Sequence, residues 1–177
     1  MRLILAIISV FSISCSNNPD LVKEFIRNEN LPVEVLKETS LIHTENGEIK
    51  VKLEASKIER FTSPTSFLNL SDGVSVYFFS DSNQLVSTLT SEEAVINEKS
   101  QVMEANTNVI LKDVNNKQLS SQQLIWDERR QLIYTEKEVI ITTADEVIHG
   151  KGFESTPDFI SYKLKQVHGS ITISNEK

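Results

Sequence analysis

Hydrophobic and polar residues alternate along most of the chain from Val35 onward, as they do in half-buried β-strands. Ile49, Val51 and Leu53 alternate with charged residues, and Asn46-Gly47 precedes them. Asn-Gly is typical of a tight hairpin because both residues tolerate positive φ. Further strands are predicted over residues 74–78, 85–90, 119–126 and 147–153, strand pairs over 102–112 and 132–142, and a last hairpin over 159–164 and 171–173.

Breaks in the alternation mark the expected connections. Residues 61–75 contain Pro64, Asp72 and Gly73, so this segment is predicted to be a loop. No long helix is expected between Val35 and Ser174, and the fold class is therefore all-β.

A nine-residue pattern recurs along the chain. Leu89-Thr-Ser-Glu-Glu-Ala-Val-Ile-Asn97 returns thirty residues later as Leu119-Ser-Ser-Gln-Gln-Leu-Ile-Trp-Asp127. Looser copies stand at Ile148-His-Gly-Lys-Gly-Phe-Glu-Ser155 and at Leu53-Glu-Ala-Ser-Lys-Ile58. A repeat of this size indicates a unit of strand, strand, turn and strand stacked on copies of itself.

The alternation also places the apolar residues of each strand on one face, which predicts two sheets packed as a sandwich. Two interpretations of this face stay open. The side chains either fill the sandwich completely, or they line a gap between the sheets that accepts acyl chains. The sequence alone does not separate the two.

Composition and chemistry exclude several classes of function. The net charge of −7 leaves no basic stripe for nucleic acid. His43, His149 and His168 lie far apart without metal-ligand spacing, and Gly150-Lys-Gly152 lacks the rest of a phosphate loop. We therefore expect no catalytic residues, no metal site and no cofactor, and we predict that the protein is not an enzyme.

The first residues have the character of an export signal. Arg2 precedes an apolar stretch from Leu3 to Ile13 that ends in Ser12-Ile-Ser-Cys15, and this stretch is shorter than the roughly 20 residues that span a bilayer. Cys15 is the single cysteine, and small residues before it resemble a bacterial lipobox, so lipidation of Cys15 is predicted. The expected organisation is a signal peptide over residues 1–14, a lipidated N-terminus and tether over 15–34, and a β domain over 35–177.

The C-terminal strand carries a second expectation. Ile171-Thr-Ile173 is followed by only four residues and by no blocking proline. An open sheet edge recruits other strands, so strand addition by a partner is predicted here. The alternative is a frayed C-terminus.

These features together resemble the LptC family of lipopolysaccharide export proteins. The resemblance rests on the N-terminal anchor, the recurring Leu89–Ala94 unit, the element His149-Gly-x-Gly-Phe-Glu-Ser155 and the closing Phe159-x-x-Tyr162-x-Leu164. The repeat is shared with the related LptA and with the N-terminal domain of LptD, so the anchor is what favours LptC. The resemblance implies a twisted β-jellyroll of two splayed, mainly antiparallel sheets that enclose an apolar groove.

The resemblance also implies a function. Such a protein accepts lipopolysaccharide from the inner-membrane LptB–LptF–LptG transporter and hands it to LptA, which docks on the C-terminal strands. The residues expected to contact lipid are Val76, Phe78, Leu89, Leu111, Leu124, Val139, Ile141 and Phe153. Those expected to bind the partner are Gly150, Tyr162, Ile171 and Ile173.

One departure from the family pattern is the anchor. The best-known members use a transmembrane helix, whereas a lipid on Cys15 is expected here, in the periplasm and at the inner membrane of a Gram-negative bacterium. The alternatives are an LptA-like carrier or an outer-membrane lipoprotein of the same fold, and a structural or adhesive β-repeat lipoprotein without lipid cargo.

Overall fold

Ten strands contain most of the residues that the computed structural model describes, which are residues 31–62 and 65–172. The strands all lie within the compact unit Pro32–Lys177. They are β1 (Glu34–Glu45), β2 (Glu48–Phe61), β3 (Phe67–Phe79), β4 (Leu85–Ser91), β5 (Glu93–Asn97), β6 (Val102–Asp113), β7 (Gln118–Asp127), β8 (Leu132–Thr142), β9 (Glu146–Ser155) and β10 (Tyr162–Thr172). The described residues contain no helix, so the all-β prediction is confirmed.

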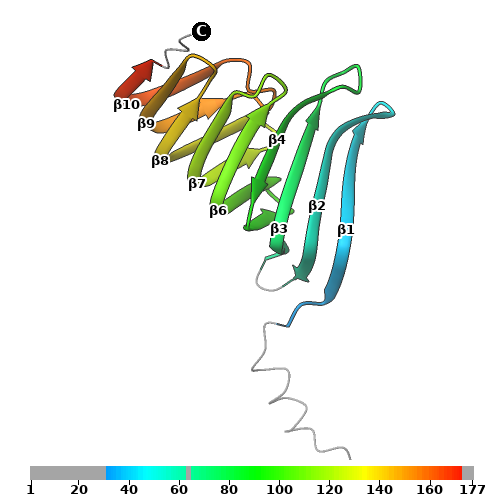
Figure 1. Cartoon of the computed structure of the whole chain (residues 1–177). Coiled ribbons are helices and arrows are strands. Elements are labelled where there is room, and N and C mark those ends of the chain that lie inside the picture. Colours follow the sequence, from blue (N-terminus) through cyan, green and yellow to red (C-terminus); the bar gives the residue numbers. More distant parts are fainter. Residues whose placement is uncertain (1–30, 63–64, 173–177) are drawn as a thin grey trace, which may run out of the picture. The chain divides into compact units, whose positions relative to one another are not determined.

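The strands form one continuous antiparallel sheet rather than two separate sheets (Figure 1). Its order is β1-β2-β3-β4-β6-β7-β8-β9-β10, and β5 pairs with both β3 and β6. β4 and β5 together occupy the place of one long strand that is interrupted at Glu92. The outer edges of the sheet are β1 and β10.

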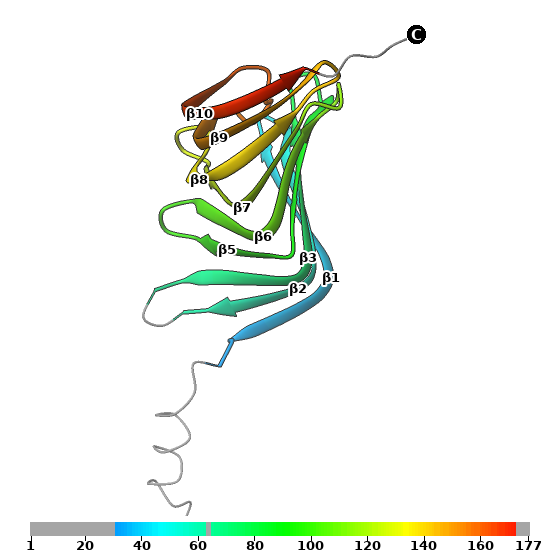
Figure 2. The ribbon, with the colours of Figure 1, turned by 60° about the vertical axis from the view of Figure 1, so that its left-hand side comes forward.

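A line of backbone irregularities crosses this sheet from strand to strand, and we call it the fold line. Pairing shifts register between Ala55 and Lys57 in β2, and between Thr135 and Glu138 in β8. β3 has positive φ at Asp72 and Gly73, and β6 has positive φ at Thr107 and Asn108. Bulges of this kind bend a strand and increase its twist. The long strands accordingly bend partway along their length, which Figure 2 shows for β1 to β3.

The fold line divides the sheet into two layers. The first layer contains residues 39–45, 48–55, 74–79, 85–91, 109–113, 118–121, 139–142, 146–150 and 166–172. The second layer contains residues 34–37, 57–61, 67–71, 93–97, 102–106, 124–127, 132–135, 153–155 and 162–164. Each turn between consecutive strands joins two strands of the same layer, so the described backbone passes between the layers only at the fold line.

The sequence repeat coincides with the fold line. Leu89 and Ala94 are both buried although they are five residues apart, which strict alternation would place on opposite faces. The irregularity between them brings both side chains to the same, inward face. Leu119 and Leu124 repeat this arrangement in β7. The repeated unit is therefore the passage of a strand from the first layer to the second.

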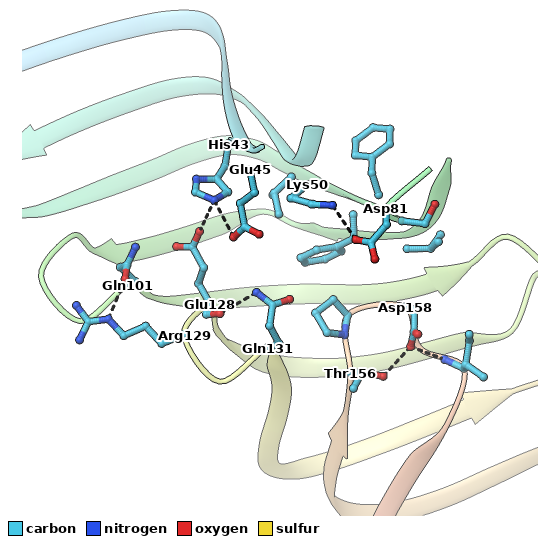
Figure 3. Close-up of a pocket in the computed structure, with 17 residues that line it drawn as sticks. His43, Glu45, Lys50, Asp81, Gln101, Glu128, Arg129, Gln131, Thr156 and Asp158 are labelled. Atoms are coloured by element: carbon cyan, nitrogen blue, oxygen red, sulfur yellow. Dashed lines mark hydrogen bonds and ion pairs between the residues drawn. The ribbon is translucent and has the colours of Figure 1, made fainter. Parts of the chain in front are cut away.

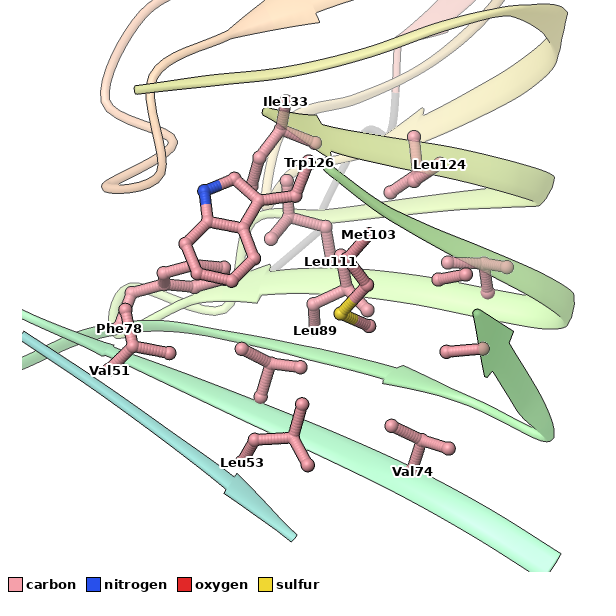
Figure 4. Close-up of a cluster of buried hydrophobic side chains, with 14 of the residues drawn as sticks. Val51, Leu53, Val74, Phe78, Leu89, Met103, Leu111, Leu124, Trp126 and Ile133 are labelled. Carbon is pink, nitrogen blue, oxygen red and sulfur yellow. The ribbon is translucent and has the colours of Figure 1, made fainter. Parts of the chain in front are cut away.

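The facing sides of the two layers form the core (Figure 4). Val76, Leu89, Leu111 and Ile141 lie in register across the first layer, and each is at most 1% exposed. The residues on the opposite, outward face are polar or exposed, as Ile140 is. The inward face predicted from the alternation is thus confirmed.

Three predictions about connections were wrong. Residues 61–75 are not one loop, because β3 begins at Phe67 and Asp72-Gly73 is a bulge within it. Residues 102–112 and 132–142 are not strand pairs, because each range belongs to one bent strand, β6 or β8. The last hairpin is likewise one strand, β10, which runs from Tyr162 to Thr172. In all three places a residue pattern read as a turn is instead a bend or bulge that keeps the strand continuous.

Candidate functional site

The space between the layers is filled at one end of the sheet. Beneath β6 to β9, the side chains of Leu119, Leu124 and Ile133 have no exposed surface. All eight residues predicted to contact lipid face inward and are at most 2% exposed. All eight belong to the one hydrophobic core, and Phe78 also lines an open cavity.

At the β1 end the layers separate and leave an apolar cavity of about 360 Å³. Its apolar walls come from both layers, and they are Leu41, Ile42, Val51, Leu53, Leu68, Ile96, Met103 and Trp126. A volume of this size lies within the range of about 300–1,000 Å³ seen for small-molecule sites. We call it the apolar cavity.

None of these wall residues was among those predicted from the sequence to contact lipid. Leu53 stood in the earliest copy of the repeat, and Trp126 in the second copy, but neither was assigned to the site. The alternation of apolar and polar residues could have identified both, because it places each side chain on the inward face of its strand. It does not show where the layers part, because that depends on contacts between distant segments.

A larger, charged cavity of about 790 Å³ adjoins the apolar cavity, and we call it the vestibule (Figure 3). The two cavities share His43, Val51, Gln101 and Glu128. The vestibule adds polar residues from several turns, namely Glu45, Lys50, Ser80, Asp81, Arg129, Gln131, Thr156 and Asp158. An amphiphile would therefore meet polar groups in one cavity and apolar walls in the next.

Ion pairs hold the charged groups of the vestibule. Lys50 Nζ lies 2.7 Å from Asp81 Oδ1 and 3.1 Å from Glu48 Oε2. The hydrogen bond from Lys50 lowers the pKa of Asp81, and bonds to Asp81 and Glu48 raise the pKa of Lys50. His43 Nε2 of β1 lies 3.6 Å from Glu128 Oε1 in the β7–β8 turn, so this pair spans the two layers.

A second charged cluster lies at the rim of the apolar cavity. The Arg60 guanidinium contacts Glu98, and its Nε donates to Glu34 Oε2 at 3.0 Å. Ser66 donates to the carboxylate of Glu98, and this bond, followed by the contact with Arg60, lowers the pKa of Glu98 against the opposing effect of burial. The cluster joins β2 to the β5–β6 turn.

Trp126 has an unsatisfied donor in the wall of the apolar cavity. Its side chain packs edge-on against Phe78, with ring centroids 5.1 Å apart. Its Nε1 is buried and is the only buried side-chain polar atom of the described residues without a hydrogen-bond partner. A buried donor left unpaired costs about 1–3 kcal/mol. Figure 4 shows this nitrogen turned away from Leu124 and Met103.

The loop of residues 156–161 covers the packed interior with Phe159 and lines the vestibule with Thr156, Pro157, Asp158 and Ile160. Phe159 is fully buried with φ of 54°, a left-handed conformation that is costly for a bulky residue. Its ring lies 5.7 Å from that of Phe153, and Lys117 Nζ lies 4.5 Å from its centroid. Ser87 of the first layer donates to the carbonyl of Pro157. The loop therefore bridges both layers over the packed interior.

Three of the four predicted partner-binding residues lie at or next to the β10 edge. Ile171 is 64% exposed on β10, and Tyr162 begins the strand, packed against Phe153 and Phe159. Burial, aided by the charge of Glu146, raises the pKa of Tyr162. Ile173 lies outside the described residues, as does the predicted lipidation site at Cys15.

Gly150 lies one strand inside this edge. It is buried in β9, between Val139 of β8 and Val167 of β10. A Cβ atom at this position would lie 2.7 Å from the carbonyl oxygen of Gln166. Glycine is therefore what allows β10 to approach β9, and any effect of Gly150 on a partner would pass through β10.

The described part of the chain lacks two features. It contains no group of three or more His, Cys, Asp or Glu side chains arranged to hold a metal ion. It also contains no helix with the length and apolar character needed to cross a membrane.

A folded antiparallel sheet with an apolar cavity between its layers, a charged vestibule and an unpaired edge strand defines a β-jellyroll suited to holding an amphiphile. A family model described as lipopolysaccharide-assembly, LptC-related, matches residues 1–171. The chain belongs to the LptC family, as its sequence features predicted. A comparison with curated proteins finds no match. Family membership gives the protein a role in lipopolysaccharide transport and indicates a periplasmic, envelope-associated protein.

Proposed function

We propose that this protein is a membrane-anchored periplasmic carrier, which accepts lipopolysaccharide from the LptB–LptF–LptG transporter between its layers and hands it to LptA. The observation that carries the proposal is the arrangement of the molecule along its sheet. An open apolar cavity lies at the β1 end, and an unpaired strand lies at the β10 end. Cargo would enter at the first and leave at the second.

The apolar cavity supports the loading step. Each buried CH₂ of an acyl chain contributes roughly 0.8 kcal/mol, so a lipid in the periplasm must be shielded continuously. The walls contributed by Leu53, Leu68 and Met103 supply such a shield. The adjoining vestibule offers polar partners for a sugar or phosphate headgroup.

Onward transfer requires the packed half to open. The predicted contact residues Leu111, Leu124, Val139 and Ile141 lie beyond the apolar cavity and fill the interior. In the proposed mechanism the layers part at these residues as lipid advances, and the loop of residues 156–161 moves aside.

Docking of LptA would use the β10 edge. The strand has a paired neighbour, β9, on one side only. Ile171 and Val167 are exposed on it, so an added strand would gain backbone hydrogen bonds and apolar contacts together. Tyr162, Gly150 and Ile173 would contribute by shaping or extending this edge.

The anchor in this proposal is acylated Cys15 at the inner membrane. An acyl-modified N-terminus provides the several buried chains that stable anchoring requires. Replacement of Cys15 by serine should release the protein from the membrane fraction. Retention of the Cys15→Ser protein in that fraction would contradict the lipid anchor.

Photo-crosslinking tests the carrier function directly. A crosslinking residue in place of Leu53 or Phe78 should capture lipopolysaccharide, whereas one in place of the outward-facing Tyr77 or Ile140 should not. Depletion of the protein should strand lipopolysaccharide at the inner membrane. Normal outer-membrane lipopolysaccharide after depletion would refute the proposal.

The packed half favours a second candidate, a structural lipoprotein without cargo. Leu119, Leu124 and Ile133 have no exposed surface there. Under this alternative neither face would be crosslinked to lipid, and depletion would leave lipopolysaccharide distribution unchanged. The same tests therefore separate the two functions.

A further inference from the structure

The loop of residues 156–161 begins and ends in one layer and is bonded to the other. It connects β9 to β10 where both strands belong to the second layer. Ser87 of β4, in the first layer, donates to the carbonyl of Pro157. Lys117 Nζ, in the β6–β7 turn of the first layer, donates to the carbonyl of Ile160 at 3.0 Å. The loop therefore joins the two layers at a second place, away from the fold line.

Lys117 makes the more extensive of these two links. Its Nζ lies 4.5 Å from the ring centroid of Phe159 and 5.7 Å from that of Tyr162. The same Nζ lies 3.7 Å from Asp113 Oδ2, and the Lys117 side chain is only 16% exposed. An ammonium is attracted to the face of an aromatic ring, and the attraction is stronger where little water reaches it. One ammonium group thus holds both a carbonyl and a ring of the loop against the β6–β7 turn.

Hydrogen bonds within the loop allow it to move as a unit. Asp158 Oδ1 accepts from the Thr156 hydroxyl at 2.6 Å and from the Ile160 N–H at 3.1 Å. The Phe159 N–H donates to the Thr156 carbonyl at 3.0 Å. Because these bonds are internal, they persist when the loop leaves the first layer. The left-handed φ of 54° at Phe159 is costly for a bulky residue, so the closed position depends on the contacts of its ring.

The loop also separates two regions of the molecule. On its inner side, Phe159 is fully buried with its ring 5.7 Å from that of Phe153. On its outer side it lines the vestibule (Figure 3) with Thr156, Pro157, Asp158 and Ile160. Movement of the loop would therefore connect the vestibule with the packed interior.

We propose that residues 156–161 form a strap that closes the packed interior toward the vestibule, and that Lys117 is the latch of this strap. This inference rests on the proposed carrier function and adds its regulation. Lipid in the apolar cavity and the vestibule advances into the packed half only when Lys117 releases Phe159 and Ile160. The latch sets how often the packed half is open, and with it the rate of onward transfer.

Hydrogen exchange of the full-length protein measures the latch. Lys117→Met keeps the aliphatic stem and removes the ammonium, so the amides of Phe159 and Ile160 should exchange about ten- to a hundredfold faster. Lys112→Met removes the same charge from an exposed residue of β6 and should leave their exchange within about twofold. The Asn115 amide, which donates within the β6–β7 turn at 2.8 Å, reports whether that turn stays intact.

Photo-crosslinking to lipopolysaccharide measures the closure. A crosslinking residue in place of Leu53, in the apolar cavity, should capture lipid equally in the wild-type and Lys117→Met backgrounds. In place of Ile141, in the packed interior, capture should rise about tenfold or more in Lys117→Met, because the open population rises with the exchange rate. Ser87→Ala removes the other link and should raise both exchange and capture about two- to tenfold.

The outcomes separate the strap from the carrier function. Unchanged exchange of Phe159 and Ile160 in Lys117→Met, or equal acceleration at Asn115, would overturn the latch. Faster exchange without added capture at Ile141 would overturn the strap. Either result leaves the carrier function standing if Leu53 captures lipid. Capture at neither position, in the wild type or any variant, would overturn the carrier function and the strap together.

Two parts of this experiment are independent of the crosslinking residue at Ile141 and of Lys117→Met. Hydrogen exchange needs no crosslinking residue, so it tests the latch even if the substitution at Ile141 prevents folding. Ser87→Ala leaves the β6–β7 turn unaltered, so it tests the strap even if Lys117→Met fails to fold. Unchanged loop exchange in Ser87→Ala would contradict the strap on its own.

Discussion

The two ends of the interior are built from the same repeated unit but differ in how they are closed. At the β1 end, Leu41 and Leu53 face a cavity whose rim carries the half-exposed Arg60–Glu98 ion pair and the contact between His43 and Glu128. At the β9–β10 end, Phe159 is fully buried against Phe153, whereas Thr156, Pro157, Asp158 and Ile160 of the same loop line the vestibule. The strand pattern is shared, so the alternation alone does not account for the difference, and the connecting loop is where the two ends differ in sequence.

This contrast indicates that the loop decides which half is accessible. The β5–β6 and β7–β8 turns at the open end place polar residues such as Glu98 and Glu128 at the rim. The β9–β10 loop instead places an aromatic ring inside. We therefore expect substitutions in the loop to convert the closed end into a second open end.

The largest effect is expected from Phe159→Ala. Loss of a fully buried aromatic side chain costs about 3–5 kcal/mol, and the packed interior should become accessible to an apolar fluorescent probe. Urea unfolding and probe binding measure the two effects. Ile160→Ala, at a neighbouring residue that is 75% exposed, should change stability by less than about 0.5 kcal/mol. Equal effects of the two substitutions would remove the special role of Phe159.

Truncation of one leucine at each end compares the packing directly. Leu124→Ala in the packed half should lower the free energy of unfolding by about 2–5 kcal/mol. Leu41→Ala at the half-buried rim should lower it by about 1 kcal/mol. Thermal or urea unfolding of both variants measures the difference. Similar losses would mean that the β1 end is packed as tightly as the other.

Gly150→Ala tests the edge of the closed end. The added methyl group would collide with the Gln166 carbonyl and force β10 away, which should cost about 1–3 kcal/mol and weaken LptA capture. Gly169→Ala is the matched control, because a Cβ there has no atom within 4 Å. Unfolding and pull-down measurements report the two effects. If Gly150→Ala changed neither the free energy of unfolding nor partner capture, β9 and β10 would accommodate the methyl group without loss of stability.

The smallest effect is expected at the rim of the open end. The pKa of Glu98 is lowered below its ordinary value of 4.5 in the folded protein. Its contribution is therefore fully present above that value and is lost as pH falls through the folded pKa. Because the pair is partly solvated, Glu98→Gln should cost about 1 kcal/mol or less. Urea unfolding at neutral and acidic pH should show the difference between wild type and variant shrinking below pH 4.5.

The inward face could be predicted from sequence because alternation is a local property. Val76, Leu111 and Val139 face the core as predicted. The continuous strands could not be predicted in the same way. Asp72-Gly73 in β3 and Asn108 in β6 adopt positive φ within bulges. The same residue types are typical of turns. The sequence therefore does not distinguish a bend within a strand from the end of a strand.

The open cavity could not be predicted from local sequence patterns for a different reason. Leu53 and Leu124 occupy equivalent inward positions of the repeat, yet Leu53 lines the cavity and Leu124 is sealed. The distinction depends on which distant segments pack against each residue, and the local sequence does not show this. The unpaired indole of Trp126 likewise appears only when its neighbours in space are known.

The described backbone passes from one layer to the other only at the fold line, and this has a thermodynamic consequence. Separation of the layers would break no turn and no rung of the hydrogen-bond ladder, since both lie within a layer. What resists separation is chiefly contact between hydrocarbon side chains, with few polar links such as those of Ser87 and Lys117 to the loop. In the proposed function an acyl chain would replace those contacts in kind. Loading would then exchange one hydrocarbon surface for another and leave the backbone ladder of each layer intact.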